Sequence, residues 1–322
     1  MIPGSHTPAA PLHLRLPATS ANLGPGFDAL GLAMALYLTI DASVADTFHI
    51  EATGRDPDLC ARLDNNLILT TYMDVLANVG IFAPRVHLQL HNEIPLGMGC
   101  GSSAAALLAG VLLANHFGNT NWTTQQILEE ACRREGHPDN VAACLLGGMT
   151  ASMVSEKGLF TATCGENLTC SLLLALPSSS LSTKKARALL PATYSREDVV
   201  ANMQATALLV AAFAQGRSDL LSAAMLDRLH QPYRSEACPL LPLLLPLVDT
   251  PGVFGVALSG AGPSVLLIAE NTAATTLPAL IRQAAADPAL EVIHTTIAAG
   301  ASWSSTASSN TQKPLGNKLD NK

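Results

Sequence analysis

The chain of 322 residues has little charge and few aromatic side chains: 13% of its residues are charged and 4% are aromatic, whereas 48% are hydrophobic. This apolar composition argues against a disordered or fibrous chain, and the length suits one large domain or two of ~100–200 residues. Basic residues are outnumbered as well, which gives a formal net charge of −7. An acidic balance argues against nucleic acids and anionic membrane surfaces as partners.

The sequence also lacks the cysteine patterns of disulfide frameworks and zinc sites. Its seven cysteines are odd in number and include no CxxC pair. The start of the chain has neither a basic nor an apolar segment, so it does not predict a signal peptide. The apolar stretch at 239–248 is interrupted by prolines and is far shorter than the ~20 residues of a membrane span. These features predict a cytoplasmic protein with no membrane partner.

Strands and helices are mixed along the chain without a regular βαβ alternation. Alternating apolar residues at 12–16 and 86–90 predict strands, and apolar residues with helical spacing predict a helix over 65–79. Past residue 168, the pattern predicts a strand, a long helix, a strand–glycine loop–strand unit, a helix and a last strand. This mixture favours an α+β fold over a doubly wound sheet. Residues beyond about 300 are polar and aperiodic, which predicts a disordered tail.

The stretch "HNEIPLGMGCGSSAAALLAG" at 91–110 is unusually rich in glycine at the point where a predicted strand meets a predicted helix. Gly97, Gly99 and Gly101 alternate just before that helix, which we expect to begin near Ser103. Glycines allow several backbone N–H groups to converge on an anion, and the helix N-terminus adds unpaired donors and the positive end of its dipole. The stretch therefore predicts a phosphate-binding loop.

Three alternatives compete with this interpretation of the loop. A Walker loop would need a lysine that the stretch does not contain. The relaxed dinucleotide pattern GxGxxA fits residues 99–104, but no acid follows about 20 residues later, because the first one is Glu129. A plain strand–helix turn, with Ser102 or Ser103 capping the helix, also fits. The loop taken alone leaves these alternatives open.

Four motifs that occur in order give the loop its context. They are "PATSANLGPGFDALGLA" (17–33), "PLGMGCGSSAAALLAG" (95–110), "EGHPDNVAACLLGGM" (135–149) and "LSGAGPSVLLI" (258–268). Together they resemble the GHMP kinases, the superfamily named for galactokinase, homoserine kinase, mevalonate kinase and phosphomevalonate kinase. The first and third motifs, with "LSTKKARALLP" at 181–191, are similar to the homoserine kinases in particular. Cys100 departs from the leucine that is usual in the family loop, at a position where no chemistry is expected.

This resemblance implies a two-domain fold with the active site in the cleft between the domains. An S5-like α+β domain would span 1–166, a ferredoxin-like domain would span 167–299, and 300–322 would be the tail. The implied reaction transfers the γ-phosphate of ATP to L-homoserine, with Mg²⁺, to give O-phospho-L-homoserine in threonine biosynthesis. Homodimers are common in the family, so a homodimer is compatible with the resemblance.

The resemblance assigns the glycine-rich loop to the phosphates of ATP. The loop residues are Pro95, Leu96, Gly97, Met98, Gly99, Cys100, Gly101, Ser102 and Ser103. A phosphate-bound Mg²⁺ keeps several waters and takes one or two protein oxygens. We expect one of these oxygens from the hydroxyl of Ser102 or Ser103. The other would come from the carboxylate of Glu135, with Glu129 as the alternative.

The resemblance also implies which residues bind the substrate, a small zwitterion with a hydroxyl group. Asn22, Asp28 and Asp139 supply polar acceptors for its ammonium group. Arg187 and Arg234 supply guanidinium groups, whose forked geometry suits a carboxylate. Each has an ordinary alternative: turn residues for Asn22 and Asp28, and solvated surface for both arginines.

Further residues complete the implied site. His137 assists substrate binding, and Gly260 lets a backbone turn approach the substrate without a Cβ clash. Thr183 joins the substrate residues, although the simplest interpretation has it capping a helix that begins at Lys184.

Asp139 and Asn140, with Ser103, are the expected catalytic residues. Asn140 would orient the attacking hydroxyl. In mevalonate-type relatives an aspartate at this place is proposed as a base, whereas homoserine kinases are thought to rely on positioning, so we expect Asp139 to act mainly in binding. Two alternatives concern the whole chain: another GHMP kinase that acts on a different alcohol, and a silent relative that senses its ligand. The intact loop, Glu135 and Asp139 argue against a silent protein.

Overall fold

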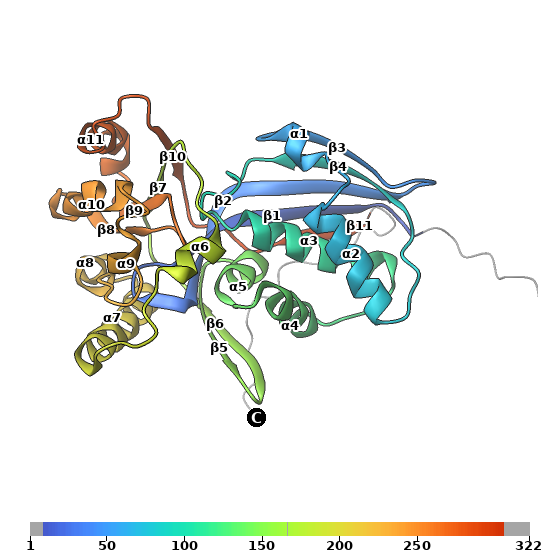
Figure 1. Ribbon diagram of the computed structural model, residues 1–322, viewed down its shortest axis with the longest axis horizontal. Helices are drawn as coiled ribbons and strands as arrows, with labels where there is room; N and C mark the ends of the chain where they lie inside the picture. The colour runs from blue at the N-terminus through green and yellow to red at the C-terminus, as the bar shows by residue number, and fades with distance from the viewer. Residues whose placement is uncertain (1–8, 166, 306–322) are drawn as a thin grey trace, which may run out of the picture.

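The computed structural model describes residues 9–165 and 167–305 (Figure 1). Two sheets organise the described residues, one of seven strands and one of four. They lie side by side along the long axis of the molecule, with the helices of each half packed on its own sheet (Figure 1). The expectations for residues 1–8 and 306–322, at the start of the chain and in its polar tail, lie outside the described residues.

The seven-stranded sheet belongs mainly to the first half of the chain. Its strands are β1 (Leu12–Asn22), β2 (Gly26–Val44), β3 (His49–Gly54), β4 (Val86–Asn92), β5 (Met149–Ser155), β6 (Gly158–Cys164) and β11 (Ser302–Ser305). The order is β11-β1-β2-β4-β3, and β5 pairs with both β2 and β6. Along residues 12–16 of β1 and along β4, residues with even numbers are buried and those with odd numbers are more exposed, whereas the rest of β1 is buried throughout. One face of this sheet therefore packs on helices while the other stays open.

The helices of the first half are α1 (Pro57–Cys60), α2 (Leu67–Asn78), α3 (Ser102–Phe117), α4 (Thr124–Glu135) and α5 (Asp139–Leu146). Helix α3 is buried on nearly all sides. Its small residues allow this: a Cβ at Gly110 would lie 2.6 Å from the Cβ of Thr71, so α2 crosses α3 in close contact. The central position of α3 places its N-terminus in the interior, beside the glycine-rich loop.

The second half forms the four-stranded sheet and the remaining helices. Its elements are β7 (Ser171–Leu176), α6 (Thr183–Ala188), α7 (Arg196–Gln215), η1 (Ser218–Leu220), α8 (Leu221–Ala224), α9 (Gln231–Arg234), α10 (Leu240–Leu244), η2 (Leu245–Asp249), β8 (Val253–Leu258), β9 (Val265–Ala269), η3 (Ala273–Thr275), α11 (Leu277–Ala284) and β10 (Glu291–Thr295). The strand order β10-β7-β9-β8, antiparallel throughout, is that of a ferredoxin-like sheet. This confirms the α+β expectation and the ferredoxin-like C-terminal half.

The boundary between the halves is not a single cut in the sequence. After β10 the chain returns to the first half, where Ile297 and Ala299 form bridges with Met34 and Gly147. Strand β11 then pairs with β1 from Arg15 to Leu12. The tail predicted from residue 300 is therefore wrong for 302–305. The prediction of a disordered tail relied on the polar side chains of this segment. It failed because β11 joins the sheet through backbone hydrogen bonds, which need no apolar side chains.

The proline-punctuated stretch at 239–248 folds into the short helices α10 and η2. In the described part of the chain, no helix combines the length and the apolar character needed to span a membrane.

Candidate active site

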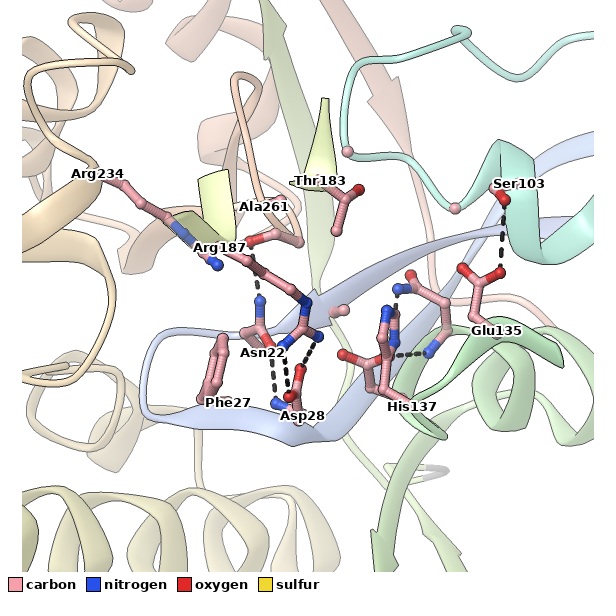
Figure 2. Close-up of a pocket in the computed structure, with 16 residues that line it drawn as sticks. Asn22, Phe27, Asp28, Ser103, Glu135, His137, Thr183, Arg187, Arg234 and Ala261 are labelled. Carbon is pink, nitrogen blue, oxygen red and sulfur yellow. Dashed lines mark hydrogen bonds and ion pairs between the residues drawn. The ribbon is translucent and has the colours of Figure 1, made fainter. Parts of the chain in front are cut away.

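A cavity between the two halves gathers most of the residues singled out in the sequence (Figure 2). It is lined by Ala21, Asn22, Phe27, Asp28, Gly99, Gly101, Ser103, Glu135, His137, Asp139, Asn140, Thr183, Arg187, Arg234, Gly260 and Ala261. Every expected substrate residue is among them. Of the expected loop residues, only Gly99, Gly101 and Ser103 line the cavity. Glu129 and Ser102 do not.

The end of β1 and the beginning of β2 carry Asn22 and Asp28 into the cavity. Both have a left-handed backbone, with φ of 70° and 56°, so the two strands are irregular next to the turn that joins them. The buried amide of Asn22 donates from Nδ2 to the carbonyl oxygen of Gly260 at 2.9 Å, and its Oδ1 accepts from the backbone N–H of Asp28 at 3.0 Å. Asn22 thus joins the first motif to the loop between β8 and β9.

Arg187, at the C-terminal end of α6, forms a two-fold ion pair with Asp28. Its Nη1 donates to Asp28 Oδ2 at 2.9 Å and its Nη2 donates to Oδ1 at 2.6 Å. These hydrogen bonds raise the pKa of Arg187. The pair joins α6 of the second half to the β1–β2 turn of the first, and both side chains remain about one-third exposed.

Arg234, at the end of α9, is a buried cation. Only 1% of its surface is exposed, and within the described residues no carboxylate lies at ion-pair distance from it. Its Nε donates to the carbonyl oxygen of Ala186 at 3.2 Å. Burial lowers the pKa of Arg234, and the nearby charge of Arg187 lowers it further. This end of the cavity therefore has two arginines, of which one, Arg187, is paired with a carboxylate. The remaining positive charge attracts an anion.

His230 and Asp227 support Arg234 and were not found by the sequence reasoning. His230 is fully buried; its Nδ1 accepts from Nη1 of Arg234 at 3.1 Å, while its Nε2 donates to the carbonyl oxygen of Gly24 at 2.8 Å. Because an arginine can only donate, this arrangement requires neutral His230 with its proton on Nε2. Burial lowers the pKa of His230 in the same sense. The spacing of His230 and Arg234, the cap and the last residue of α9 and four positions apart, is the signal that could have predicted such a pair.

The side chain of Asp227 holds the backbone of this histidine in place. Its carboxylate accepts from the N–H groups of His230 at 3.1 Å and Gln231 at 2.6 Å, and from Leu229 at 2.9 Å. An aspartate that satisfies the free N–H groups at the start of a helix is a typical capping arrangement. Phe27 packs on the same group, with its ring centre 5.4 Å from the guanidinium carbons of both Arg187 and Arg234.

Helix α5, absent from the sequence prediction, begins in the "EGHPDN" motif and presents its first turn to the cavity. Asp139 is 2% exposed, and its Oδ1 accepts from His137 Nδ1 at 2.6 Å and from the backbone N–H of Asn140 at 2.7 Å. Burial alone would lower the pKa of His137, but its hydrogen bond to Asp139 raises it overall. Oδ1 of Asn140 accepts from the hydroxyl of Thr19 at 2.8 Å, which fixes the orientation of the amide.

The glycine-rich loop adopts a backbone that glycine alone accommodates well. Gly97, Gly99 and Gly101 have φ of 70°, 75° and 70°. A Cβ at Gly99 would run into the carbonyl oxygen of Ser259, and the hydroxyl of Ser259 donates to the carbonyl oxygen of Gly99 at 2.7 Å. Gly101 is the residue before α3, and within residues 9–165 and 167–305 no side chain caps this helix. The capped-turn alternative for the serines is therefore wrong, and the N–H groups of the first turn remain available.

The two candidate acids for a cation lie in different places. Glu135 lines the cavity, and its Oε2 accepts from the hydroxyl of Ser103 at 3.4 Å. Burial raises the pKa of Glu135, and the charge of His137 partly offsets this. Glu129 is exposed on α4, where it accepts from Gln125 Nε2 at 2.8 Å. Carboxylate and hydroxyl oxygens suit Mg²⁺, so Glu135 and Ser103 have both the chemistry and the place for it.

Helix α6 begins one residue earlier than expected. Ser182 is its cap, since its hydroxyl accepts from the backbone N–H of Lys185 at 3.3 Å, and Thr183 is the first helical residue. The interpretation of Thr183 as a cap is therefore wrong. Freed from that role, Thr183 lines the cavity.

Known proteins with a similar sequence cover both halves of the chain. Residues 66–148 match the model of the GHMP kinases N-terminal domain, and residues 209–286 match that of the GHMP kinases C-terminal domain. The homoserine kinase of Solibacter usitatus is 49% identical over 260 residues, which cover 80% of this chain and 85% of that protein. The homoserine kinase of Desulfitobacterium hafniense is 41% identical over 263 residues, or 81% of this chain and 88% of that one.

Solved structures extend the similarity to the fold. The crystal structure of homoserine kinase from Cytophaga hutchinsonii superposes with a TM-score of 0.78 at 25% identity, over 92% of this chain and 98% of that one. Phosphomevalonate kinase from Streptococcus pneumoniae superposes with a TM-score of 0.65 at 13% identity, over 90% of this chain and 100% of that one. The second similarity concerns the fold alone.

Proposed function

The chain belongs to the GHMP kinases, in the branch of the homoserine kinases, and we infer from this that it is an ATP-dependent kinase of L-homoserine. The reaction transfers the γ-phosphate of ATP to the side-chain hydroxyl and gives O-phospho-L-homoserine, a step of threonine biosynthesis. One observation in the cavity carries the choice of an amino-acid substrate. Among the described residues, Arg234 is buried without a carboxylate of its own, in a cavity that is also lined by Arg187, Asp28 and Asp139.

The two arginines bind the carboxylate of the substrate. A buried guanidinium is costly without an anion, so an incoming carboxylate gains a strong, charge-assisted pair there. Arg234 is held from behind by His230 and Ala186, which leaves Nη2 for the ligand. Arg187 is already paired with Asp28 and adds charge from the other side. A neutral alcohol would leave this charge uncompensated.

The ammonium group of the substrate binds at carboxylates that line the same cavity. Asp139 and Asp28 are two of them, and Asn22 Oδ1 accepts from the backbone N–H of Asp28. His137 holds Asp139 through a hydrogen bond of 2.6 Å. A cavity that offers both the unpaired Arg234 and these carboxylates favours a zwitterion over a neutral alcohol.

The phosphates of ATP bind at the glycine-rich loop and the N-terminus of α3. The three glycines keep the backbone of the loop open to an anion, and the uncapped first turn adds N–H donors and the helix dipole. Ser103 or Ser102, with Glu135, holds the Mg²⁺ that such a transfer requires. When bound, this ion neutralises charge on the phosphates.

The attacking hydroxyl is positioned by Asn140, whose amide is fixed by Thr19 and Asp139. Asp139 Oδ1 already accepts three hydrogen bonds, one from His137 and two from Asn140, and the side chain is almost fully buried. This environment favours a positioning role for Asp139 over that of a catalytic base. Phosphoryl transfer needs little covalent help from the protein, so alignment and charge neutralisation account for most of the rate.

An assay of ADP formation from ATP in the presence of Mg²⁺ tests the substrate. Four alcohols are offered in turn: L-homoserine, mevalonate, galactose and shikimate. We expect L-homoserine to give the highest kcat/KM, because the other three lack the ammonium–carboxylate pair for which the cavity offers partners. Faster ADP release with any other alcohol would assign the chain to a different branch of the family. ATP binding without ADP release for any of the four would indicate a silent, ligand-sensing protein.

A further inference from the structure

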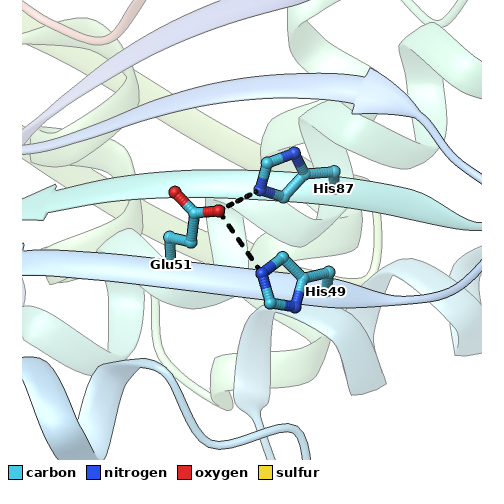
Figure 3. Close-up of side chains that lie close together, drawn as sticks. All are labelled: His49, Glu51 and His87. Atoms are coloured by element: carbon cyan, nitrogen blue, oxygen red, sulfur yellow. Dashed lines mark ion pairs between the residues drawn. The ribbon is translucent and has the colours of Figure 1, made fainter.

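The open face of the N-terminal sheet carries two histidines and a glutamate, away from the cavity (Figure 3). Strands β3 and β4 are parallel, with His49 opposite His87 and Glu51 opposite Gln89. Side chains two residues apart on a strand share a face, so His49 and Glu51 project together, and His87 meets them from the next strand. The backbone register therefore holds all three side chains in one cluster.

The ligand atoms of this cluster have the spacing of a metal site. Nε2 of His49 lies 3.4 Å from Oε1 of Glu51, and Nε2 of His87 lies 3.2 Å from the same oxygen. All three atoms lie within 4.8 Å of one another. Around a tetrahedral ion with bonds of about 2.0–2.1 Å, neighbouring ligand atoms stand about 3.3 Å apart. Two of the three separations match this value.

Two further contacts support an ion rather than a simple cluster of hydrogen bonds. Nε2 of His87 is buried and, among the described residues, has no hydrogen-bond partner, because its approach to Glu51 lacks the geometry of a hydrogen bond. An imidazole nitrogen in that position has a lone pair to offer. On the other side, Oε2 of Glu51 accepts from Gln89 Nε2 at 3.4 Å, which turns Oε1 toward the histidines. Outer partners of this kind orient the ligands of metal sites.

We propose that His49, Glu51 and His87 bind a divalent transition-metal ion of the Zn²⁺ or Ni²⁺ type. Two imidazoles and one carboxylate suit these ions, whereas Mg²⁺ prefers ligands that are all oxygen. The side chains of His49 and Glu51 are more than half exposed, so water completes the coordination and the affinity is moderate. The ion links β3, the edge strand of the sheet, to β4, and so stabilises that edge.

Titration of the chelator-treated full chain tests the site, with Ni²⁺ and Co²⁺ as probes. We expect one ion per chain, an absorption spectrum of Co²⁺ without thiolate charge-transfer bands, and a rise in Tm on loading. The thiolate bands matter because Cys60 and Cys164 are partly exposed and offer a competing site.

His49→Ala, His87→Ala and Glu51→Gln should each weaken the affinity by at least about tenfold and abolish the metal-induced rise in Tm. His13→Ala is the matched control: His13 lies on the same face and pairs with Asp41 at 2.7 Å, but has no second imidazole beside it. The Tm of the metal-free variants shows that they fold. Unchanged affinity and stoichiometry in His49→Ala and His87→Ala would overturn the proposal, as would thiolate bands in the Co²⁺ spectrum.

Discussion

The two walls of the cavity are built in different ways. The phosphate wall, residues 95–103, is made of backbone: three glycines with φ near 70–75° form it, and the N-terminus of α3 follows. The substrate wall includes the side chains of Asn22, Asp28, Arg187 and Arg234, which come from both halves of the molecule, with His230 behind Arg234. The first wall is contiguous in sequence, whereas the second joins residues that lie far apart, such as Arg187 and Asp28, which are 159 positions apart.

This difference predicts two kinds of sensitivity. At the glycines of the phosphate wall the absence of a Cβ matters most, so even alanine is harmful there. In the substrate wall, the chemical group at each position matters, and a variant that keeps the hydrogen bonds keeps the function. Substitutions in the phosphate wall should also change the kinetics of ATP more than those of L-homoserine. Substitutions in the substrate wall should do the reverse.

Arg234→Ala should have the largest effect on the substrate wall. Loss of one partner from a desolvated charge pair costs roughly 2–5 kcal/mol, which lowers kcat/KM for L-homoserine by about 30- to 5,000-fold. The KM for ATP should change little, because Arg234 lies away from the loop. Arg217→Ala is the control, since Arg217 pairs with Asp219 on the surface. A normal kcat/KM in Arg234→Ala would remove this residue from the site.

Glu135→Gln should lower kcat by roughly 10²-fold or more and raise the Mg²⁺ concentration needed for half-maximal rate. The amide keeps the shape of the side chain but removes the charge that draws the ion. Glu129 lies on the exposed face of the same helix, so Glu129→Gln should leave both quantities unchanged. The opposite pattern, with Glu129 sensitive and Glu135 insensitive, would transfer the ion to Glu129.

Gly99→Ala should damage the phosphate wall selectively. A left-handed backbone costs a non-glycine residue about 1–3 kcal/mol, and the added Cβ meets the carbonyl oxygen of Ser259. We expect kcat/KM for ATP to fall by about 5- to 150-fold, with a smaller change for L-homoserine. Gly80→Ala has a similar φ of 74° but open space around the Cβ, so it controls for backbone strain alone. Equal losses for both substrates would mean that the walls are not independent.

His230→Ala should raise the KM for L-homoserine by about tenfold, because Arg234 loses the acceptor that directs its guanidinium group. His230→Gln offers one acceptor and one donor in a similar place, so it should restore most of the loss. A steady-state comparison of the two variants separates positioning from packing. If both variants were equally impaired in KM, the histidine would serve packing only.

The smallest effect concerns the pH dependence of stability. Burial lowers the pKa of His230 below its ordinary value of about 6.5, so the unfolded chain binds this proton more readily than the folded one. The contribution of neutral His230 to stability is therefore full above pH 6.5 and is lost as the pH falls below it. Urea unfolding between pH 5 and pH 7.5 should show a shallower pH slope for His230→Gln than for the unchanged chain. Parallel slopes would contradict the buried, neutral state of the histidine.

Much of the architecture was predictable from local patterns. The helix expected over 65–79 is α2, and the alternation at 86–90 is β4, because apolar periodicity reflects burial on one face. The failures are equally physical. Strand β11 has a polar sequence and forms only because the edge of β1 lies beside it, and α5 starts at a proline with no side-chain cap to announce it.

The sequence by itself determined the glycine-rich loop and the family, since both depend on residues that are neighbours along the chain. The arrangement of the substrate wall was decided by the tertiary structure. Whether an arginine is solvated or buried depends on what packs around it: in the folded chain Arg187 meets Asp28, which is 159 positions away, and Arg234 meets His230 and Phe27 without a carboxylate. The same holds for Glu135 and Glu129, two acids on one helix, of which only Glu135 faces the cavity. Spacing along a chain determines which residues lie in the same loop, strand or helix. The burial of a side chain, the charges around it and its pKa are set by neighbours that only folding brings together.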